Sequence, residues 1–253
     1  MKKITINPIT RLEGHGKIDI FLDDAGEVHR AFFQVPELAG FEKFLEGRPV
    51  EEAPRITPRI CGVCPTTHHL AAVKACDAVY GVEPPPAAKK IREIMNSAFM
   101  IEDHAIHFYF LGGPDFVVGP SAPKGERNIL GVIGKVGLEI AGQVIAARRE
   151  CREVVEMIGG KTIHPVGCLP GGISQPLTAE KIARIKVVAD HAIEFAKLTL
   201  QIFEDVVLKN KSYVDLIVGD VYDHQTHYMG LVDRNNCVNL YDGLVRVVTP
   251  QGK

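Results

Sequence analysis

The sequence contains no tryptophan, only 7% aromatic residues and no apolar run of the length that crosses a membrane. It also lacks an excess of either charge, since 29 basic and 31 acidic residues give a formal net charge of −2. This balance gives no support for a nucleic-acid partner or an anionic membrane surface. No apolar signal region follows Lys2 and Lys3, so we expect a cytoplasmic protein without a membrane span.

The six cysteines do not supply a second pair at metal-ligand spacing. Only Cys61 and Cys64 stand three positions apart, and the isolated ones are Cys76, Cys151, Cys168 and Cys237. A structural zinc site needs four ligands, usually with a second CxxC or an HxxxH. His68 and His69 could complete such a site, but adjacent side chains on a helix point about 100° apart and rarely both bind one ion. In a cytoplasmic chain of this length, six cysteines indicate reduced thiols, some of them ligands, rather than a disulfide framework.

The cysteine pair lies in the stretch 59–69, which reads R-I-C-G-V-C-P-T-T-H-H. Gly62 lets the backbone bend between the thiols, and Pro65 suits the first position of a helix. We therefore expect both thiols to face one centre at a helix N-terminus, where the dipole and free N–H groups favour thiolates. Taken alone, the spacing is compatible with half a zinc site, a redox pair or chance. A thioredoxin-like role needs a strand–helix–strand context, whereas here a proline-rich loop precedes the pair.

The chain divides by pattern into four segments of one domain, 1–253. A β meander with a polar loop covers 1–36, and a short helix (38–47) and the cysteine loop cover 37–64. Long amphipathic helices are predicted within 65–210, at 65–80, 87–111, 128–158 and 178–209. Residues 211–253 are predicted to be irregular and β. The fold class is therefore α+β, mostly α, with a small N-terminal antiparallel sheet and a bundle of long helices.

Several motifs together resemble the large (alpha, catalytic) subunit of nickel–iron hydrogenases. They are Arg11-Leu12-Glu13-Gly14-His15, Gly40-Phe41-Glu42, Gly47-Arg48 and the cysteine stretch 59–69. The match continues through Pro114-Asp115, His164-Pro165 and Pro170-Gly171-Gly172, and so covers essentially the whole chain. The chain is most similar to the cytoplasmic, multi-subunit branch, whose partners reduce nicotinamide, a deazaflavin, ferredoxin or heterodisulfide. The resemblance implies the hydrogenase large-subunit fold, in an incomplete form.

The resemblance also implies roles for individual residues. Cys61 matches a terminal nickel ligand, and Cys64 matches a ligand that bridges nickel to an iron carrying carbon monoxide and cyanide. His68 matches the histidine that hydrogen-bonds the bridging sulfur. Glu13 matches the carboxylate that relays protons, and Glu42 matches a carboxylate ligand of a nearby magnesium ion. These roles agree with ligand chemistry, because soft thiolates suit nickel and iron and a hard carboxylate suits magnesium.

One departure from the family is a missing second cysteine pair in a DPCxxC context. In the family that pair supplies the other two thiolates, one of which is the usual first base for protons. We therefore expect either a fragment or a naturally split subunit, with a separate chain carrying the DPCxxC half. An iron–sulfur small subunit, which would hold the iron–sulfur clusters, is the other expected partner. The chain alone should be inactive.

An alternative function is a non-catalytic scaffold that docks an iron–sulfur partner. Such a protein would be a remnant of the hydrogenase family or a relative of the quinone-site large subunit of respiratory complex I. The complex I relative lacks the cysteines, so the intact pair Cys61 and Cys64 argues against that version. A neighbouring reading frame with DPCxxC would favour the hydrogenase over the scaffold.

Overall fold

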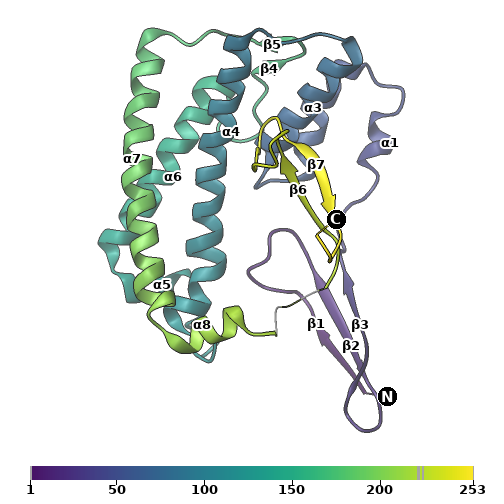
Figure 1. Ribbon diagram of the computed structural model, residues 1–253, viewed down its shortest axis with the longest axis vertical. Coiled ribbons are helices and arrows are strands. Elements are labelled where there is room, and N and C mark those ends of the chain that lie inside the picture. Colours follow the sequence, from purple (N-terminus) through teal and green to yellow (C-terminus); the bar gives the residue numbers. More distant parts are fainter. Residues whose placement is uncertain (1, 221–222, 224, 253) are drawn as a thin grey trace. The chain divides into compact units, whose positions relative to one another are not determined.

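The structure is a computed structural model that describes residues 2–220, 223 and 225–252 (Figure 1). Contacts divide the chain into two compact units, Met1–Phe195 and Ala196–Lys253, and the boundary falls within helix α7. None of the helices in the described part of the chain combines the length and apolar character needed to span a bilayer.

The first unit begins with a three-stranded antiparallel sheet and continues with short turns and long helices. Its strands are β1 (Lys2–Ile6), β2 (Lys17–Leu22) and β3 (Val28–Gln34), followed by the short elements α1 (Phe41–Leu45), η1 (Val50–Glu52), α2 (Ala53–Ile56) and η2 (Thr57–Ile60). The long helical part contains α3 (Pro65–Tyr80), α4 (Pro86–Ile106), η3 (His107–Gly112), η4 (Pro114–Val118), α5 (Ile129–Val136), α6 (Leu138–Gly159), the strands β4 (Cys168–Leu169) and β5 (Gly172–Ile173), and the start of α7 (Ala179–Phe203).

The N-terminal sheet has the order β1-β2-β3, with Ile4 paired to Ile20 and Ile6 paired to Ile18. Its one buried residue is Asp19 on the central strand, which accepts hydrogen bonds from Thr5 Oγ1 and Gln34 Nε2. The sheet matches the predicted meander. The polar loop 7–16 joins the end of β1 to the start of β2 and therefore extends from that end of the sheet.

The hydrophobic core of the first unit lies between the long helices. Its buried residues come from α3, α4, α6, β4 and α7, and they are Leu70, Val73, Met95, Ala98, Phe99, Val154, Val155, Ile158, Cys168 and Val188. Helices α4 and α6 lie side by side along most of their length (Figure 1). Cys64 packs against the edge of this core, which anchors the cysteine loop to the rigid part of the fold.

The hairpin β4–β5 packs against α3 and α4 and is held by buried polar groups. Pro170 and Gly171 form its turn, and Gly171 has φ of 81°, a value that glycine adopts without strain. His69, on α3, accepts a hydrogen bond at Nε2 from the Cys168 N–H at 3.1 Å. Its Nδ1 lies 2.9 Å from the Pro54 carbonyl oxygen. His69 thus ties α2, α3 and β4 together next to the cysteines.

Three predicted helices differ from the structure. The predicted helix 178–209 is α-helical only to Phe203 and continues as the π-helical η5 (Glu204–Leu208). The predicted helix 128–158 is two helices, because Gly137 has φ of 87° and ends α5 before α6 begins. The predicted helix 87–111 is α-helical only to Ile106, after which wider π-helical turns follow in η3 and η4. By contrast, α3 has the predicted bounds, with Pro65 at its first position and Gly81 in the left-handed region at its end.

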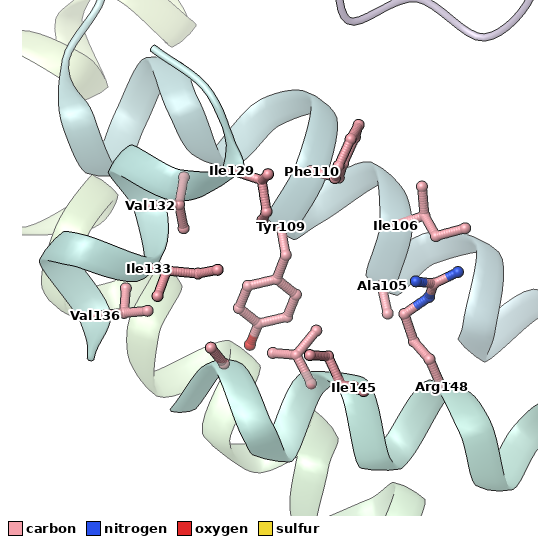
Figure 2. A pocket seen from close by; sticks show the side chains of 12 residues that line it. Ala105, Ile106, Tyr109, Phe110, Ile129, Val132, Ile133, Val136, Ile145 and Arg148 are labelled. Atoms are coloured by element: carbon pink, nitrogen blue, oxygen red, sulfur yellow. The ribbon is translucent and has the colours of Figure 1, made fainter. Parts of the chain in front are cut away.

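A cavity of about 220 Å³ lies where η3, α5 and α6 meet (Figure 2). Figure 2 shows Tyr109, Ile133 and Ile145 pointing into it from three sides, with Arg148 at one edge. Its lining is almost entirely apolar and includes no cysteine, so it is not a metal site.

The second unit contains the end of α7, η5 (Glu204–Leu208), α8 (Lys211–Val218), β6 (Tyr228–Val232) and β7 (Leu244–Val248). The prediction of irregular and β structure after residue 210 missed α8. Asn210 caps that helix by accepting from the backbone N–H groups of Ser212 and Tyr213. The predicted strand near the end of the chain is β7, which pairs antiparallel with the preceding strand β6.

Candidate metal centre

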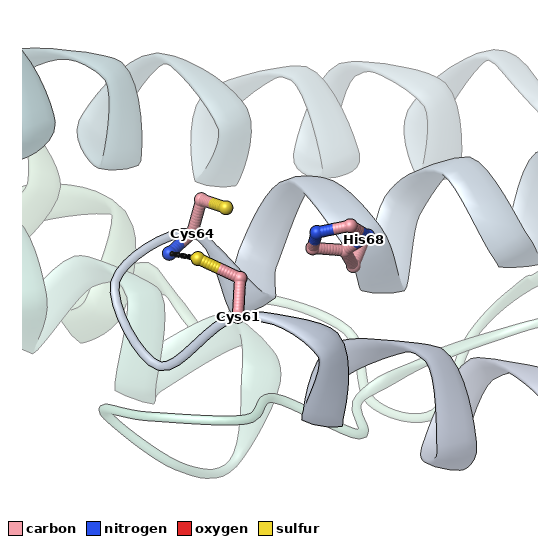
Figure 3. A group of neighbouring side chains, drawn as sticks. All are labelled: Cys61, Cys64 and His68. Atoms are coloured by element: carbon pink, nitrogen blue, oxygen red, sulfur yellow. Dashed lines mark hydrogen bonds between the residues drawn. The ribbon is translucent and has the colours of Figure 1, made fainter. Parts of the chain in front are cut away.

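The cysteine loop is a short connection between η2 and α3. Cys61 has an extended backbone and is 7% exposed, whereas Cys64 is half-buried and stands at the N-cap of α3. The Cys64 backbone N–H donates to Cys61 Sγ at 3.0 Å, as the dashed line in Figure 3 shows. This hydrogen bond folds the loop back on itself and brings the two side chains together, as the spacing predicts.

His68 completes a group of three potential ligands. It lies on α3 four residues after Cys64, on the same face of the helix, and is half-buried. The ligand atoms of Cys61, Cys64 and His68 all lie within 4.8 Å of one another (Figure 3). Two soft sulfurs and one imidazole form a donor set that suits nickel, zinc or low-spin iron rather than a hard cation.

The charge around the sulfurs is negative. Burial raises the pKa of the Cys64 thiol to about 12, and the neighbouring Cys61, Glu13 and Asp103 add to that rise. The effect of burial on the Cys64 thiol is therefore larger than that of the helix N-terminus, which was expected to favour the thiolate. The same acidic neighbours that hold the proton on Cys64 would stabilise a cation between the sulfurs. The residues present therefore fit a metal ion bound by thiolates.

Glu13 reaches the centre from the loop 7–16, which is 48 residues away from Cys61 in the sequence. The Cys61 Sγ–H donates to Glu13 Oε1 at 3.4 Å. Glu13 is itself an exposed residue, so its carboxylate connects a buried sulfur to solvent.

Glu42 is not brought to this group. It lies in the first turn of α1 and is exposed. Within the described residues, the ligand group at the centre consists of Cys61, Cys64 and His68, and Glu42 is not a member. The isolated cysteines at 76, 151, 168 and 237 are not members of it either.

Asp103 is an acidic neighbour of Cys64 that the sequence analysis did not name. It lies on α4, and its charge acts on Cys64. Burial raises the pKa of the Asp103 carboxyl, and the nearby Glu102 raises it further. The sequence gives no local signal for this role, because Asp103 is one of several polar residues on a long amphipathic helix.

Comparison with known proteins identifies related sequences. A family model described as nickel-dependent hydrogenase matches residues 39–128, and one described as HoxL-like matches residues 3–38. An iron-sulfur subunit of the F420-non-reducing hydrogenase of Archaeoglobus profundus is 52% identical over 243 residues, 96% of this chain and 50% of the relative. A vhu subunit of the F420-non-reducing hydrogenase of Methanocaldococcus jannaschii is 47% identical over 255 residues, 100% of this chain and 59% of the relative.

A solved hydrogenase structure has the same fold as this chain. The crystal structure of an NAD+-reducing [NiFe]-hydrogenase in the H2-reduced state superposes with a TM-score of 0.90 at 36% identity, over 100% of this chain and 55% of that chain. The predicted fold class, mostly α with small antiparallel sheets, is confirmed by this match. The chain spans about half the length of the curated relatives it matches. By its motifs, its fold and these matches, the chain belongs to the nickel-dependent hydrogenase large-subunit family.

Proposed function

We propose that this chain provides one half of the nickel–iron site of a hydrogenase that oxidises or evolves H2. The observation that carries the proposal is the convergence of Cys61, Cys64 and Glu13, from two segments far apart in the sequence, around the buried Cys61 sulfur. A CxxC pair alone is compatible with several metals, so the choice of nickel and iron rests on family membership.

Cys61 would hold nickel, and Cys64 would hold nickel and the iron that carries carbon monoxide and cyanide. His68 lies close enough to orient the Cys64 sulfur. When bound, this centre would supply the heterolytic cleavage of H2. A magnesium ion at Glu42 is part of the proposal, and the exposed carboxylate on α1 is compatible with a site completed by other residues.

The role of Glu13 is to move a proton between the buried centre and solvent. A proton taken up first by a thiolate of the missing cysteine pair would pass to the Glu13 carboxylate, and the S–H bond would break as the O–H bond forms. The contact with Cys61 Sγ holds that carboxylate beside the centre. The proton would then leave from the exposed carboxyl group to water. The reverse sequence would deliver protons for H2 evolution.

The remaining two thiolates would come from a segment with the DPCxxC pattern outside these 253 residues. Electrons would pass to an iron–sulfur small subunit, so the working enzyme would be a hetero-oligomer. We also propose a cytoplasmic location, in keeping with six cysteines that are all free.

The test uses the 253-residue chain with and without a polypeptide that carries the DPCxxC half. Hydrogen-dependent viologen reduction and elemental analysis of nickel and iron are measured after gel filtration. We expect activity and retained nickel only in the complex, and we expect Cys61→Ser and Cys64→Ser to abolish both. Cys237→Ser is the matched control, because Cys237 is exposed and belongs to no ligand group of described residues.

Two results would contradict the proposal. Activity with stoichiometric nickel in the chain alone would mean that other residues of this chain complete the site. Absence of nickel from a stable complex would favour the non-catalytic scaffold instead.

A further inference from the structure

The loop 7–16 places Glu13 next to Cys61, but the conformation of this loop is not determined by the pairing of the sheet. The pairing of β1 and β2 ends at Ile6 and Ile18. Beyond that point, one backbone hydrogen bond crosses the loop, from the Ile9 N–H to the Gly16 carbonyl. Glu13 is exposed near the far end of this loop, so other contacts must determine where its carboxylate lies.

Arg11, two residues before Glu13, supplies such contacts. Its guanidinium donates to both oxygens of the Asp115 carboxylate, from Nη1 to Oδ2 at 2.7 Å and from Nη2 to Oδ1 at 2.8 Å. Nη1 also donates to the Leu111 carbonyl at 2.9 Å. A two-bond arginine–carboxylate pair fixes orientation as well as distance. The loop is therefore bound to η3 and η4, about a hundred residues further along the chain.

The backbone of Arg11 indicates that this contact shapes the loop. Its φ is 55°, in the left-handed region that residues with a side chain adopt only when their surroundings hold them there. On the other side of Glu13, the His15 N–H and Nδ1 both contact Glu37 Oε1, but that pair is exposed. The guanidinium of Arg11 is more buried than the His15 ring, with 24% exposure against 73%. Arg11 is therefore the firmer of the two anchors beside Glu13.

We propose that Arg11, held by Asp115, is a positioning residue that keeps the Glu13 carboxylate within hydrogen-bond distance of Cys61. This inference rests on the proposed function, in which Glu13 relays protons beside the Cys61 sulfur. Arg11 acts through the loop backbone, because its fork of donors is directed at Asp115 and not at the sulfurs. Without the Arg11 side chain, the loop loses the contact with Asp115 that determines where the Glu13 carboxylate lies.

Cross-linking tests the position of residue 13 without any metal. Glu13→Cys is introduced into the full chain together with Cys64→Ser and Cys237→Ser, so that Cys61 is the expected partner thiol. Dibromobimane, which becomes fluorescent when two thiolates displace its two bromides, then reports whether residue 13 lies near Cys61, and peptide mapping identifies the joined residues. Arg11→Met and Asp115→Asn should each lower the yield of this cross-link about tenfold, since a bidentate charged pair is lost.

A charge swap separates positioning from general stability. Arg11→Asp combined with Asp115→Arg should restore most of the cross-link when Arg127→Gln is also present, because the pair is rebuilt in reverse and Arg127, 4.0 Å from Asp115, no longer faces a like charge. Lys43→Met, which removes an exposed pair with Glu46, should leave the yield unchanged. An unchanged yield in Arg11→Met would overturn the proposal. So would a loss that the swap does not recover although the swapped chain has a normal melting temperature.

Activity in the reconstituted complex distinguishes this inference from the function on which it rests. Arg11→Met should lower the turnover number about tenfold while nickel content and the KM for H2 stay unchanged. If Glu13→Gln keeps full activity while the cross-link still depends on Arg11, the relay role of Glu13 fails and the positioning role stands. If Glu13→Gln is inactive but the cross-link ignores Arg11, the relay stands and the positioning role fails.

Discussion

Arg92 and Asp77 form an ion pair in the interior of the first unit, with Nη1 donating to Oδ2 at 2.6 Å. The guanidinium also donates to the carbonyls of Leu169 and Gly172, and the carboxylate accepts from the Gly171 N–H. Both side chains thus hold the hairpin β4–β5 through hydrogen bonds to its backbone. That hairpin in turn supplies the N–H that holds His69, on the helix that begins at Cys64. The ion pair therefore stabilises the hairpin that contacts α3, the helix that begins beside the metal centre.

Arg92→Met should therefore destabilise the chain by about 3–5 kcal/mol, since it leaves the Asp77 charge buried without its partner. Urea unfolding followed by circular dichroism measures the effect. Adding Asp77→Asn to Arg92→Met should recover part of the loss, because the uncompensated charge is then removed. Lys43→Met, at an exposed pair, should cost at most about 0.5 kcal/mol. A cost below about 1 kcal/mol for Arg92→Met would show that the cluster relaxes without the guanidinium.

His69 should make stability depend on pH. Burial lowers its pKa, and the nearby Arg92 lowers it further, so the folded chain keeps the ring neutral. A neutral ring is also what the hydrogen bonds require, with Nδ1–H donating to Pro54 and Nε2 accepting from Cys168. The unfolded ring titrates near 6.5. The contribution to stability is therefore complete above about pH 6.5 and is lost as the pH falls through the lower folded value.

Unfolding midpoints measured from pH 8 to pH 5 test this dependence. We expect the unfolding midpoint of the wild-type chain to decrease as the pH is lowered below about 6.5. His69→Gln should be less stable than the wild type at pH 8, but its midpoint should decrease less on acidification. Some dependence should persist, since burial also lowers the pKa of His164. His29→Gln is the control, because His29 lies on an exposed strand. A wild-type profile that is flat over this range would contradict the assignment.

Two glycines should respond in opposite ways to alanine. Gly137 separates α5 from α6 with φ of 87° and ψ of 161°, a region that is essentially restricted to glycine, so Gly137→Ala should cost about 1–3 kcal/mol from backbone strain alone. Gly142 lies inside α6 with open space around it, so Gly142→Ala should stabilise the chain by about 0.5–1 kcal/mol. Thermal unfolding of both variants decides the matter. A stabilising Gly137→Ala would mean that α5 and α6 can join into the one helix that the sequence pattern predicts.

The sequence predicts those features of the fold that have a local chemical cause. Pro65 and Gly81 mark the ends of α3, and Thr178 caps α7 by accepting from the Lys181 N–H. The break at Gly137 was not predicted, because a glycine within a helical pattern has no fixed outcome. Helix α8 could have been found, since Asn210 before an apolar run is a capping signal.

The site divides in a similar way. The CxxC spacing predicts that Cys61 and Cys64 lie together, because their proximity is a local property of the loop. Glu13 was assigned from the family resemblance, and no spacing rule would place it beside Cys61. Asp103 and the pairing of Arg11 with Asp115 were missed, because contacts between distant segments leave no periodic pattern in one sequence.

The paired thiols should bind a divalent metal weakly even in the isolated chain, and more tightly as the pH rises. Each thiol must lose its proton to bind, and the pKa of Cys64 is raised to about 12, so binding releases protons throughout the accessible range. Affinity should therefore increase up to about tenfold per pH unit for each proton released. Titration with Co2+ from pH 6.5 to pH 8.5, followed by the thiolate-to-cobalt absorption, measures both the affinity and its slope.

Cys64→Ser should remove most of this absorption, while His68→Gln should weaken binding and keep the thiolate signal, since His68 lies within 4.8 Å of both sulfurs. Cys237→Ser should change neither, because Cys237 is exposed and belongs to no such group among the described residues. An affinity that does not vary with pH would mean that the sulfurs are already ionised before the metal arrives. That result would contradict the negative surroundings of Cys64, since Glu13 and Asp103 both favour the protonated thiol until a cation takes the place of the proton.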